Sequence, residues 1–156
     1  HTNDAASAVT RLIDMGIEPF LVTSSVIAII AQRLLRVLCP KCKEAYTPDG
    51  ESLANLGIDM KQLDRHPLYR KQGCAACMNT GYRGRTAIFY ILILDDPLKR
   101  LILKTSDANQ IQDEAMKRGM TNLLADGAKK VLEGTTTIEE VFRVTRILKR
   151  ETDIEA

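Results

Sequence analysis

The first residues of the chain place apolar side chains at helical spacing. Asn3 or Asp4 can cap such a helix, and Gly16 follows its last turn as a stop signal. The segment therefore predicts an amphipathic helix whose inner face is formed by Ala5, Ala8, Val9, Leu12 and Ile13.

The next segment, Val26 to Leu38, has almost no polar side chain before Gln32. A helix that is apolar on nearly every side is normally buried inside a larger body. With Ser24 or Ser25 as its cap, we predict a second helix over these residues. The body around it must be larger than the first 38 residues alone can supply.

A third apolar segment, TAIFYILIL at Thr86 to Leu94, is rich in residues that favour strands. Because it has no polar interruption, we predict a strand that is covered on both faces. The sequence Asp95–Pro97 ends this strand and starts a short helix from Leu98 to Lys104, since Pro is favoured in the first helical turn.

Three further helices complete the predicted elements. The first starts at a capping box of Asp107 with Gln110 and ends at Gly119. The second starts at Thr121 and ends at Gly134, and the third starts at a capping box of Thr137 with Glu140. In the last of these helices the inner stripe is formed by Ile138, Val141, Phe142 and either Val144 or Thr145. The pattern predicts a helical C-terminal part.

Composition and charge narrow the class of protein. The chain has 156 residues, 45% of them hydrophobic but only 4% aromatic, so we expect an aliphatic core. Lys and Arg number 22 against 20 Asp and Glu, which favours no polyanionic partner overall, although residues 33–85 carry a net charge of +5. The most apolar run is too short to span a bilayer, and no secretory signal is visible. We expect a cytosolic protein and, because the sequence starts at His1, a piece of a longer chain.

Four cysteines form two pairs with the same internal spacing. Cys39 and Cys42 enclose two residues, as do Cys74 and Cys77, and 31 residues separate the pairs. Two residues between ligands let one turn place both sulfurs on one ion. Two such turns complete a tetrahedron with no position open to water or substrate. We therefore predict a structural zinc site of four thiolates that takes no part in catalysis.

The segment between the cysteine pairs explains why a metal is needed. Residues 43–73 are charged, contain Pro and Gly, and have few apolar side chains, so burial alone cannot offset the entropy lost on ordering them. Zinc binding contributes about 10–16 kcal/mol in small zinc domains. The alternatives are four buried thiols, two disulfides, or a redox Cys-Pro-x-Cys centre. A redox centre needs a strand-to-helix turn, whereas Cys39 is expected to follow a helix and enter a polar loop.

Other candidate motifs are weaker. The sequence from Gly81 to Gly84 is similar to the glycine clamp of RNA-binding KH modules, but it lies between a cysteine turn and a strand instead of between helices. His66 lies in polar sequence and is expected to be solvated. Lys104-Thr105 has no glycines ahead of it, so the chain contains no phosphate-binding loop of the Walker A type.

Several motifs together resemble one family, the bacterial type II secretion and type IV pilus assembly ATPases. Three segments are similar to the family's histidine box: His1–Ala5, Ala8–Leu12 and Asp14–Gly16. At the borders of the metal lobe the similar segments are Ala31–Leu34 with Leu38–Pro40, and Gly81–Thr86. In the terminal helices they are Asp126–Gly127, Lys130–Val131 and Thr136–Thr145. The similarity extends from residue 1 to about 147. Phe89, Tyr90 and Ile93 depart from the family's usual residues.

The resemblance implies a cytoplasmic hexameric ATPase at the inner membrane, in which ATP and magnesium act in a RecA-like core. By position, His1 matches the histidine-box residue near the γ-phosphate, and Arg11 and Arg85 match arginines near the nucleotide and the subunit interface. The alternative for both arginines is a surface ion pair. Implied partners are identical subunits and the inner-membrane platform and cytoplasmic-domain proteins of the machine, with contact to anionic lipid through the basic lobe.

The predicted fold class is therefore α/β: the C-terminal part of a RecA-like ATPase core, mostly helical with a buried strand, plus a small tetracysteine zinc lobe and a C-terminal helical bundle. The predicted divisions are residues 1–38 (end of the core), 39–85 (zinc lobe), 86–105 (strand and helix returning to the core) and 106–156 (C-terminal helical subdomain). Because the phosphate loop is missing, we expect this chain alone to be inactive.

Two other function classes remain open from the sequence. One is a stand-alone zinc-ribbon module that binds nucleic acid or protein. Its basic lobe, however, offers only three tyrosines for the stacking that single-stranded nucleic acid requires, Tyr46, Tyr69 and Tyr82. The other is a purely structural adaptor.

Overall fold

The computed structural model describes residues 5–63 and 66–145. Its elements are α1 (Ala5–Asp14), α2 (Pro19–Ser25), β1 (Ala28–Leu38), β2 (Glu44–Tyr46), α3 (Gly50–Leu56), η1 (Met60–Gln62), β3 (Leu68–Arg70), η2 (Ala75–Cys77), β4 (Tyr82–Ile93), α4 (Asp96–Ile102), α5 (Ala108–Lys117), α6 (Leu123–Leu132) and α7 (Ile138–Thr145). The chain is thus a mixed α/β structure. The cap positions Asn3 and Asp4 and the site residue His1 lie outside the described residues.

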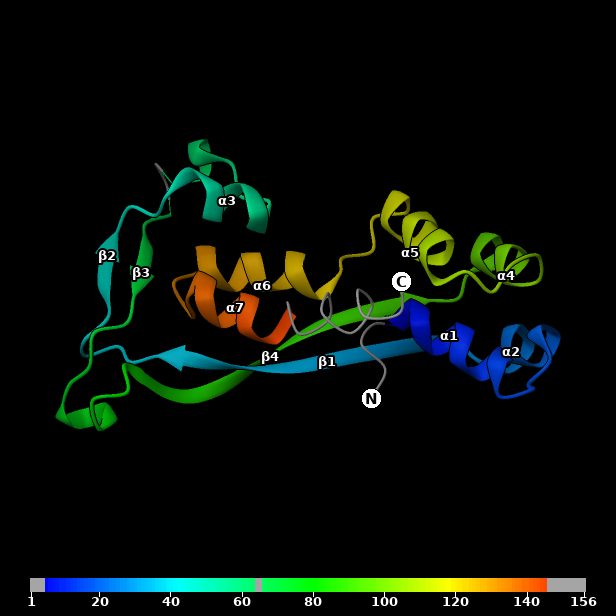
Figure 1. The fold of residues 1–156 in the computed structure, drawn as a ribbon, viewed down its shortest axis with the longest axis horizontal. Coiled ribbons are helices and arrows are strands. Elements are labelled where there is room, and N and C mark those ends of the chain that lie inside the picture. Colours follow the sequence, from blue (N-terminus) through cyan, green and yellow to red (C-terminus); the bar gives the residue numbers. More distant parts are fainter. Residues whose placement is uncertain (1–4, 64–65, 146–156) are drawn as a thin grey trace, which may run out of the picture. The chain divides into compact units, whose positions relative to one another are not determined.

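The chain forms two compact units, each built from two separate segments. The first unit combines residues 1–32 with 89–123, and the second combines residues 33–88 with 124–156. The long strands β1 and β4 pair with each other and contribute residues to both units (Figure 1).

Helices form most of the first unit. Helix α1 packs against α2 and α5, and α4 packs against α2 and α5. The α1 helix presents Val9 to the core as its spacing predicts, and Gly16 adopts φ +89° after its last turn. Asp95 caps α4 by accepting a hydrogen bond from the backbone N–H of Leu98, with Pro97 in the first turn. These predictions of local structure are confirmed.

The second unit holds all four cysteines and the last two helices. Strands β2 and β3 pair antiparallel, with Ala45 opposite Tyr69. Helices α6 and α7 lie side by side (Figure 1), and a Cβ atom at Gly127 would come within 2.5 Å of Cγ1 of Val141, so the two helices need glycine at that position. The core of this unit is aliphatic, as the composition predicts, and includes Leu35, Leu38, Leu53, Leu56, Leu68, Ile88, Val131, Ile138 and Val141.

The predicted helix over Val26–Leu38 is wrong. Residues Ala28–Leu38 form strand β1, and the helix of this region is α2, which ends where the sequence predicted a start. The run from Val26 to Ile30 is rich in β-branched residues, which favour strands because their side chains pack well on a pleated surface. The description of the chain as mostly helical with one strand is corrected accordingly.

The predicted strand at Thr86–Leu94 is confirmed, but it is not covered on both faces. Burial alternates along β4: Tyr90 and Leu92 are buried, while Ile91 and Ile93 are 45% and 49% exposed. Buried and exposed side chains therefore alternate in the C-terminal half of the strand, so only one face of that half is covered. Among the described helices none is both long and apolar enough to cross a membrane.

Candidate metal centre and arginine cluster

The four cysteine sulfurs converge at one point. All four Sγ atoms lie within 4.8 Å of one another, and the distances are 3.9 Å between Cys39 and Cys74, 3.9 Å between Cys42 and Cys77, and 3.8 Å between Cys74 and Cys77. Four thiolates at about 2.3 Å from a tetrahedral zinc ion lie roughly 3.8 Å apart. None of the four is in a disulfide. The donor set and its spacing therefore fit a four-thiolate metal ion.

Two tight turns bring the sulfurs together. After Cys39, the backbone N–H groups of Cys42 and Lys43 both donate to the Cys39 carbonyl. The second turn is the short helix η2, in which the N–H of Cys77 donates to the carbonyl of Cys74. The backbone of Cys39 also donates to the carbonyl of Gly81, so the ends of β1 and β4 hold the two turns next to each other.

Backbone N–H groups point at one of the sulfurs. Those of Cys74 and Gly81 each lie 3.2 Å from Sγ of Cys77, a buried residue. Burial opposes ionisation of this thiol, but the two N–H donors outweigh it and lower the pKa of Cys77 to about 6. Burial raises the pKa of Cys42 to about 11, and hydrogen bonding with the neighbouring cysteine thiols raises it further. A cation among the four sulfurs would favour the thiolate forms instead.

The elements on either side of Cys39 and Cys42 bear on the redox alternative. Cys39 follows strand β1, not the predicted helix, so the element before the cysteine turn does not exclude a redox centre. The chain after Cys42 nevertheless enters strand β2 instead of a helix. The strand-to-helix turn that a Cys-x-x-Cys redox centre requires is therefore missing.

Lys43 links the cysteine turn to the turn between α6 and α7. Its Nζ atom donates to the carbonyl of Gly134 at 2.9 Å and lies 4.2 Å from the ring centroid of Tyr69. Gly134 has φ +66°, and a Cβ atom there would be 2.8 Å from the Tyr69 ring. The three residues form a compact contact next to the candidate metal centre.

A buried carboxylate on α7 holds two arginine side chains. Glu140 is 1% exposed and accepts hydrogen bonds from the backbone N–H of Arg36 (3.0 Å) and from both guanidinium groups. Arg36 donates through Nε at 3.0 Å and Nη2 at 2.7 Å, and Arg143 donates through Nε at 2.9 Å and Nη2 at 2.7 Å. Burial opposes ionisation of Glu140, but the two guanidinium groups lower its pKa to about 2.

The role of Glu140 in this cluster differs from the one that its sequence pattern predicts. The pattern predicts a capping box of Thr137 and Glu140, and half of it is confirmed, since the Thr137 hydroxyl accepts from the backbone N–H of Glu140 at 3.2 Å. The Glu140 carboxylate, however, binds the two arginines. Arg36 is more than one hundred residues away in the sequence, and no local pattern predicts that pairing.

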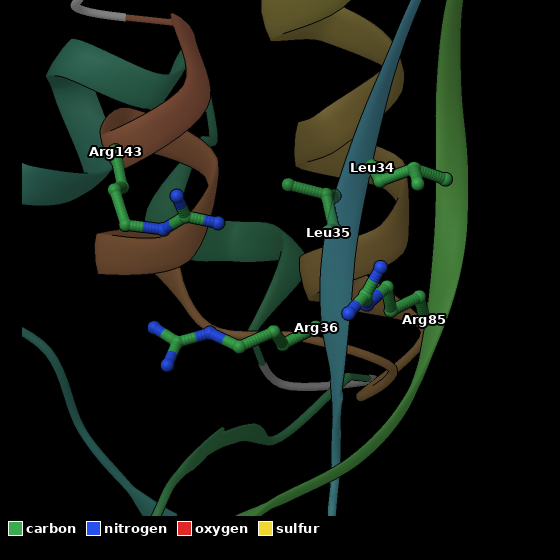
Figure 2. A pocket seen from close by; sticks show the side chains of 5 residues that line it. All are labelled: Leu34, Leu35, Arg36, Arg85 and Arg143. Atoms are coloured by element: carbon green, nitrogen blue, oxygen red, sulfur yellow. The ribbon is translucent and has the colours of Figure 1, made fainter.

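Arg85 lies at the edge of the same cluster. With Arg36, Arg143 and two leucines it lines a pocket of about 390 Å³. Figure 2 shows Arg85 coming from β4, Arg36 from β1 and Arg143 from α7. Arg11 is an exposed residue of α1 in the first unit. The structure thus brings Arg85 together with two arginines that the sequence analysis did not select as site residues, and His1 lies outside the described residues.

Comparisons with known proteins agree with the resemblance stated above. A family model described as "Type II/IV secretion system protein" matches residues 1–143. The chain is 49% identical over 146 residues to "Type II secretion system protein E" of Pseudomonas aeruginosa, 46% to "Type II secretion system ATPase E" of Vibrio cholerae, and 43% over 145 residues to "Type IV pilus assembly ATPase PilB" of Thermus thermophilus. These matches cover 94%, 94% and 93% of this chain but only 28%, 28% and 16% of the relatives.

Proposed function

This chain belongs to the type II/IV secretion system protein family, and from that membership we propose that it is the metal-bearing C-terminal part of an ATPase that drives type II secretion or type IV pilus assembly. The observation that carries the proposal is the match over residues 1–143 combined with the convergence of the four sulfurs. The relatives named as ATPases are three to six times longer, so ATP hydrolysis is proposed for a larger protein that contains this chain.

In this proposal the metal is zinc and its role is structural. Cys39, Cys42, Cys74 and Cys77 hold the ion, and four thiolates leave no position for water or substrate. When bound, zinc supplies positive charge that neutralises the clustered thiolates. Within the chain, the cysteine turns and the contact of Lys43 with Gly134 hold the lobe of residues 39–85 in place.

The proposal also includes the assembly, location and partners that the family resemblance implies. The assembled protein is a hexamer of a RecA-like ATPase that acts on the cytoplasmic side of the inner membrane, with the platform and cytoplasmic-domain proteins of the machine as partners. Arg11 and Arg85 act near nucleotide bound by the larger protein, as does His1. The 156-residue chain by itself is expected not to hydrolyse ATP, because its sequence has no loop in which backbone N–H groups cradle phosphates.

The structure gives less support to the alternative function, a stand-alone module that binds nucleic acid. Stacking on bases needs open aromatic faces. Tyr82 is 8% exposed and has the Arg36 guanidinium 4.3 Å from its ring centroid, and Tyr69 is covered by Lys43. Two of the three tyrosines in the basic lobe are therefore already occupied by cations of the same chain.

A domain exchange tests the proposed function. Residues 1–146 would replace the matching part of the Pseudomonas aeruginosa relative, and ATP hydrolysis and type II secretion by the hybrid would be measured. We expect the hybrid to retain both, and we expect the hybrid with Arg85→Ala to hydrolyse ATP more slowly while folding normally. A hybrid that folds and assembles like the parent but neither hydrolyses ATP nor supports secretion would contradict the proposal.

A further inference from the structure

The turn between α6 and α7, residues 134–137, contacts the chain on both sides of the first cysteine turn. The carbonyl of Gly134 accepts a hydrogen bond from Nζ of Lys43 at 2.9 Å, and the carbonyl of Thr135 accepts from the backbone N–H of Leu38 at 2.8 Å. Leu38 is the residue before that cysteine turn, and Lys43 is the residue after it. The α6–α7 turn is therefore bonded to both ends of the first cysteine turn.

Thr137 extends these contacts to the second cysteine pair. Its hydroxyl lies 3.0 Å from the hydroxyl of Tyr82, within hydrogen-bond distance. Tyr82 follows Gly81, whose backbone N–H lies 3.2 Å from Sγ of Cys77 and whose carbonyl accepts from the backbone N–H of Cys39. The Tyr82 side chain thus links the α6–α7 turn to the residue that connects the two cysteine pairs.

The contacts of this turn are buried. Thr136 and Thr137 are 0% and 1% exposed, and Tyr82 is 8% exposed. A Cβ atom at Gly134 would lie 2.8 Å from the ring of Tyr69, so the turn packs directly against β3. Leaving a buried hydroxyl or carbonyl without its partner costs free energy, because water cannot replace the lost bond. The turn therefore keeps these bonds only while the residues beside the cysteines hold their positions.

From these contacts we propose that the α6–α7 turn supports the metal centre from outside its ligands, so that metal binding and the order of this turn are thermodynamically linked. The inference rests on the proposed structural metal site and goes beyond it. A bound ion fixes the two cysteine turns relative to each other, and the residues next to them form the hydrogen bonds with the α6–α7 turn. Outer residues that orient metal ligands raise metal affinity. Because linkage is reciprocal, the metal stabilises the turn by the same factor that the turn adds to metal affinity.

The same linkage reaches the arginine cluster around Glu140. Helix α7 begins directly after the turn, and its Glu140 accepts hydrogen bonds from the backbone N–H and the guanidinium of Arg36. The hydroxyl of Thr136 donates to the carbonyl of Arg36 at 2.8 Å. Both backbone groups of Arg36 are therefore bonded to the turn or to α7. We expect loss of the metal to loosen this cluster, although none of its residues is a metal ligand.

The first test measures the zinc affinity of the complete chain by competition with a colorimetric chelator. We expect Lys43→Met to bind one equivalent of zinc with roughly tenfold weaker affinity, because it loses the bond to Gly134. Lys41→Met is the matched control, since it removes the same charge at an exposed position of the same cysteine turn, and it should stay within about twofold of the parent. An unchanged affinity in Lys43→Met would overturn the proposal. So would an equal loss in Lys41→Met, which would mean that positive charge near the thiolates, not the contact, sets the affinity.

The second test follows amide hydrogen exchange of the parent chain with zinc bound and after a chelator removes it. The backbone N–H groups of Thr135 and Val141 donate to the carbonyls of Lys130 and Thr137, and we expect both to exchange at least roughly tenfold faster without zinc. The N–H of Ile111, in α5 of the first unit, is the internal control and should not change. Unchanged exchange at Thr135 and Val141, or the same acceleration at Ile111, would refute the linkage. A parent chain that binds no zinc would contradict the proposed metal site as well, whereas zinc binding without linkage contradicts this inference alone.

Discussion

Glu140→Gln removes the charge that holds two arginines in the second unit while keeping the size of the side chain. Lowering the pKa of a carboxyl group by one unit corresponds to about 1.4 kcal/mol. For Glu140 the fall from an ordinary 4.5 to about 2 corresponds to about 3 kcal/mol. Because the guanidinium groups of Arg36 and Arg143 are about half exposed, solvent recovers part of this, and we expect a loss of about 2 kcal/mol at neutral pH.

The measurement is urea unfolding at neutral pH followed by far-ultraviolet circular dichroism. A loss of about 2 kcal/mol corresponds to a melting temperature lower by roughly 4–8 °C for a chain of this size. Glu139→Gln is the matched control, since Glu139 is the neighbouring residue of α7 and is exposed. If Glu140→Gln cost no more than Glu139→Gln, the buried carboxylate would not be the group that stabilises this unit.

The same variant predicts a pH dependence with a definite sign. The pKa of Glu140 is lower in the folded chain than in the unfolded chain, so its contribution is complete above about pH 5 and is lost as the pH falls toward about 2. The difference in unfolding free energy between the parent chain and Glu140→Gln should therefore shrink across that range. A difference that stayed constant from pH 7 to below pH 3 would mean that packing, not charge, causes the loss.

Three further substitutions test other contacts of the second unit. Lys43→Met removes the bond to the Gly134 carbonyl and should cost about 1–2 kcal/mol in urea unfolding. Gly127→Ala places a methyl group 2.5 Å from Cγ1 of Val141 and should cost about 1–3 kcal/mol in the same assay. Cys77→Ser should abolish stoichiometric metal binding and make residues 43–73 sensitive to limited proteolysis, because the lobe has little apolar surface to bury.

Matched substitutions control for these effects. Lys41→Met changes the same side chain at an exposed position of the cysteine turn, and Gly50→Ala adds a methyl group where nothing lies within 4 Å. We expect both to change stability by less than about 0.5 kcal/mol. Equal effects in Lys43→Met and Lys41→Met would rule out the proposed role of the Lys43 contact, and a neutral Gly127→Ala would rule out close packing of α6 on α7.

The sequence predicted the features that depend on local chemistry. Paired Cys-x-x-Cys turns identified the four sulfurs that converge, and Asp95 with Pro97 identified the start of α4. Asp107 was also predicted as a cap, and its carboxylate accepts from the backbone N–H of Asn109, although Gln110 donates to the Asp107 side chain instead of closing the capping box. Such features are encoded within a few residues, so a short pattern is enough to find them.

The features that the sequence did not predict depend on distant residues. An apolar run such as Val26–Ala31 fits a buried helix or a strand equally well by spacing alone, and what decides is the pairing of β1 with β4, which lies about fifty residues further along. The pairing of Glu140 with Arg36 is of the same kind. Its only local signal was a glutamate in the first turn of a helix, which helix capping explains equally well.

The most direct test of the account is the metal content of the complete chain, purified with its thiols protected. The four sulfurs lie at the separations that a tetrahedral thiolate site requires, so we expect one equivalent of zinc per chain. We also expect that removing it with a chelator unfolds the lobe of residues 39–85. Less than half an equivalent of zinc, with the four thiols shown to be reduced and the chain folded, would contradict the account.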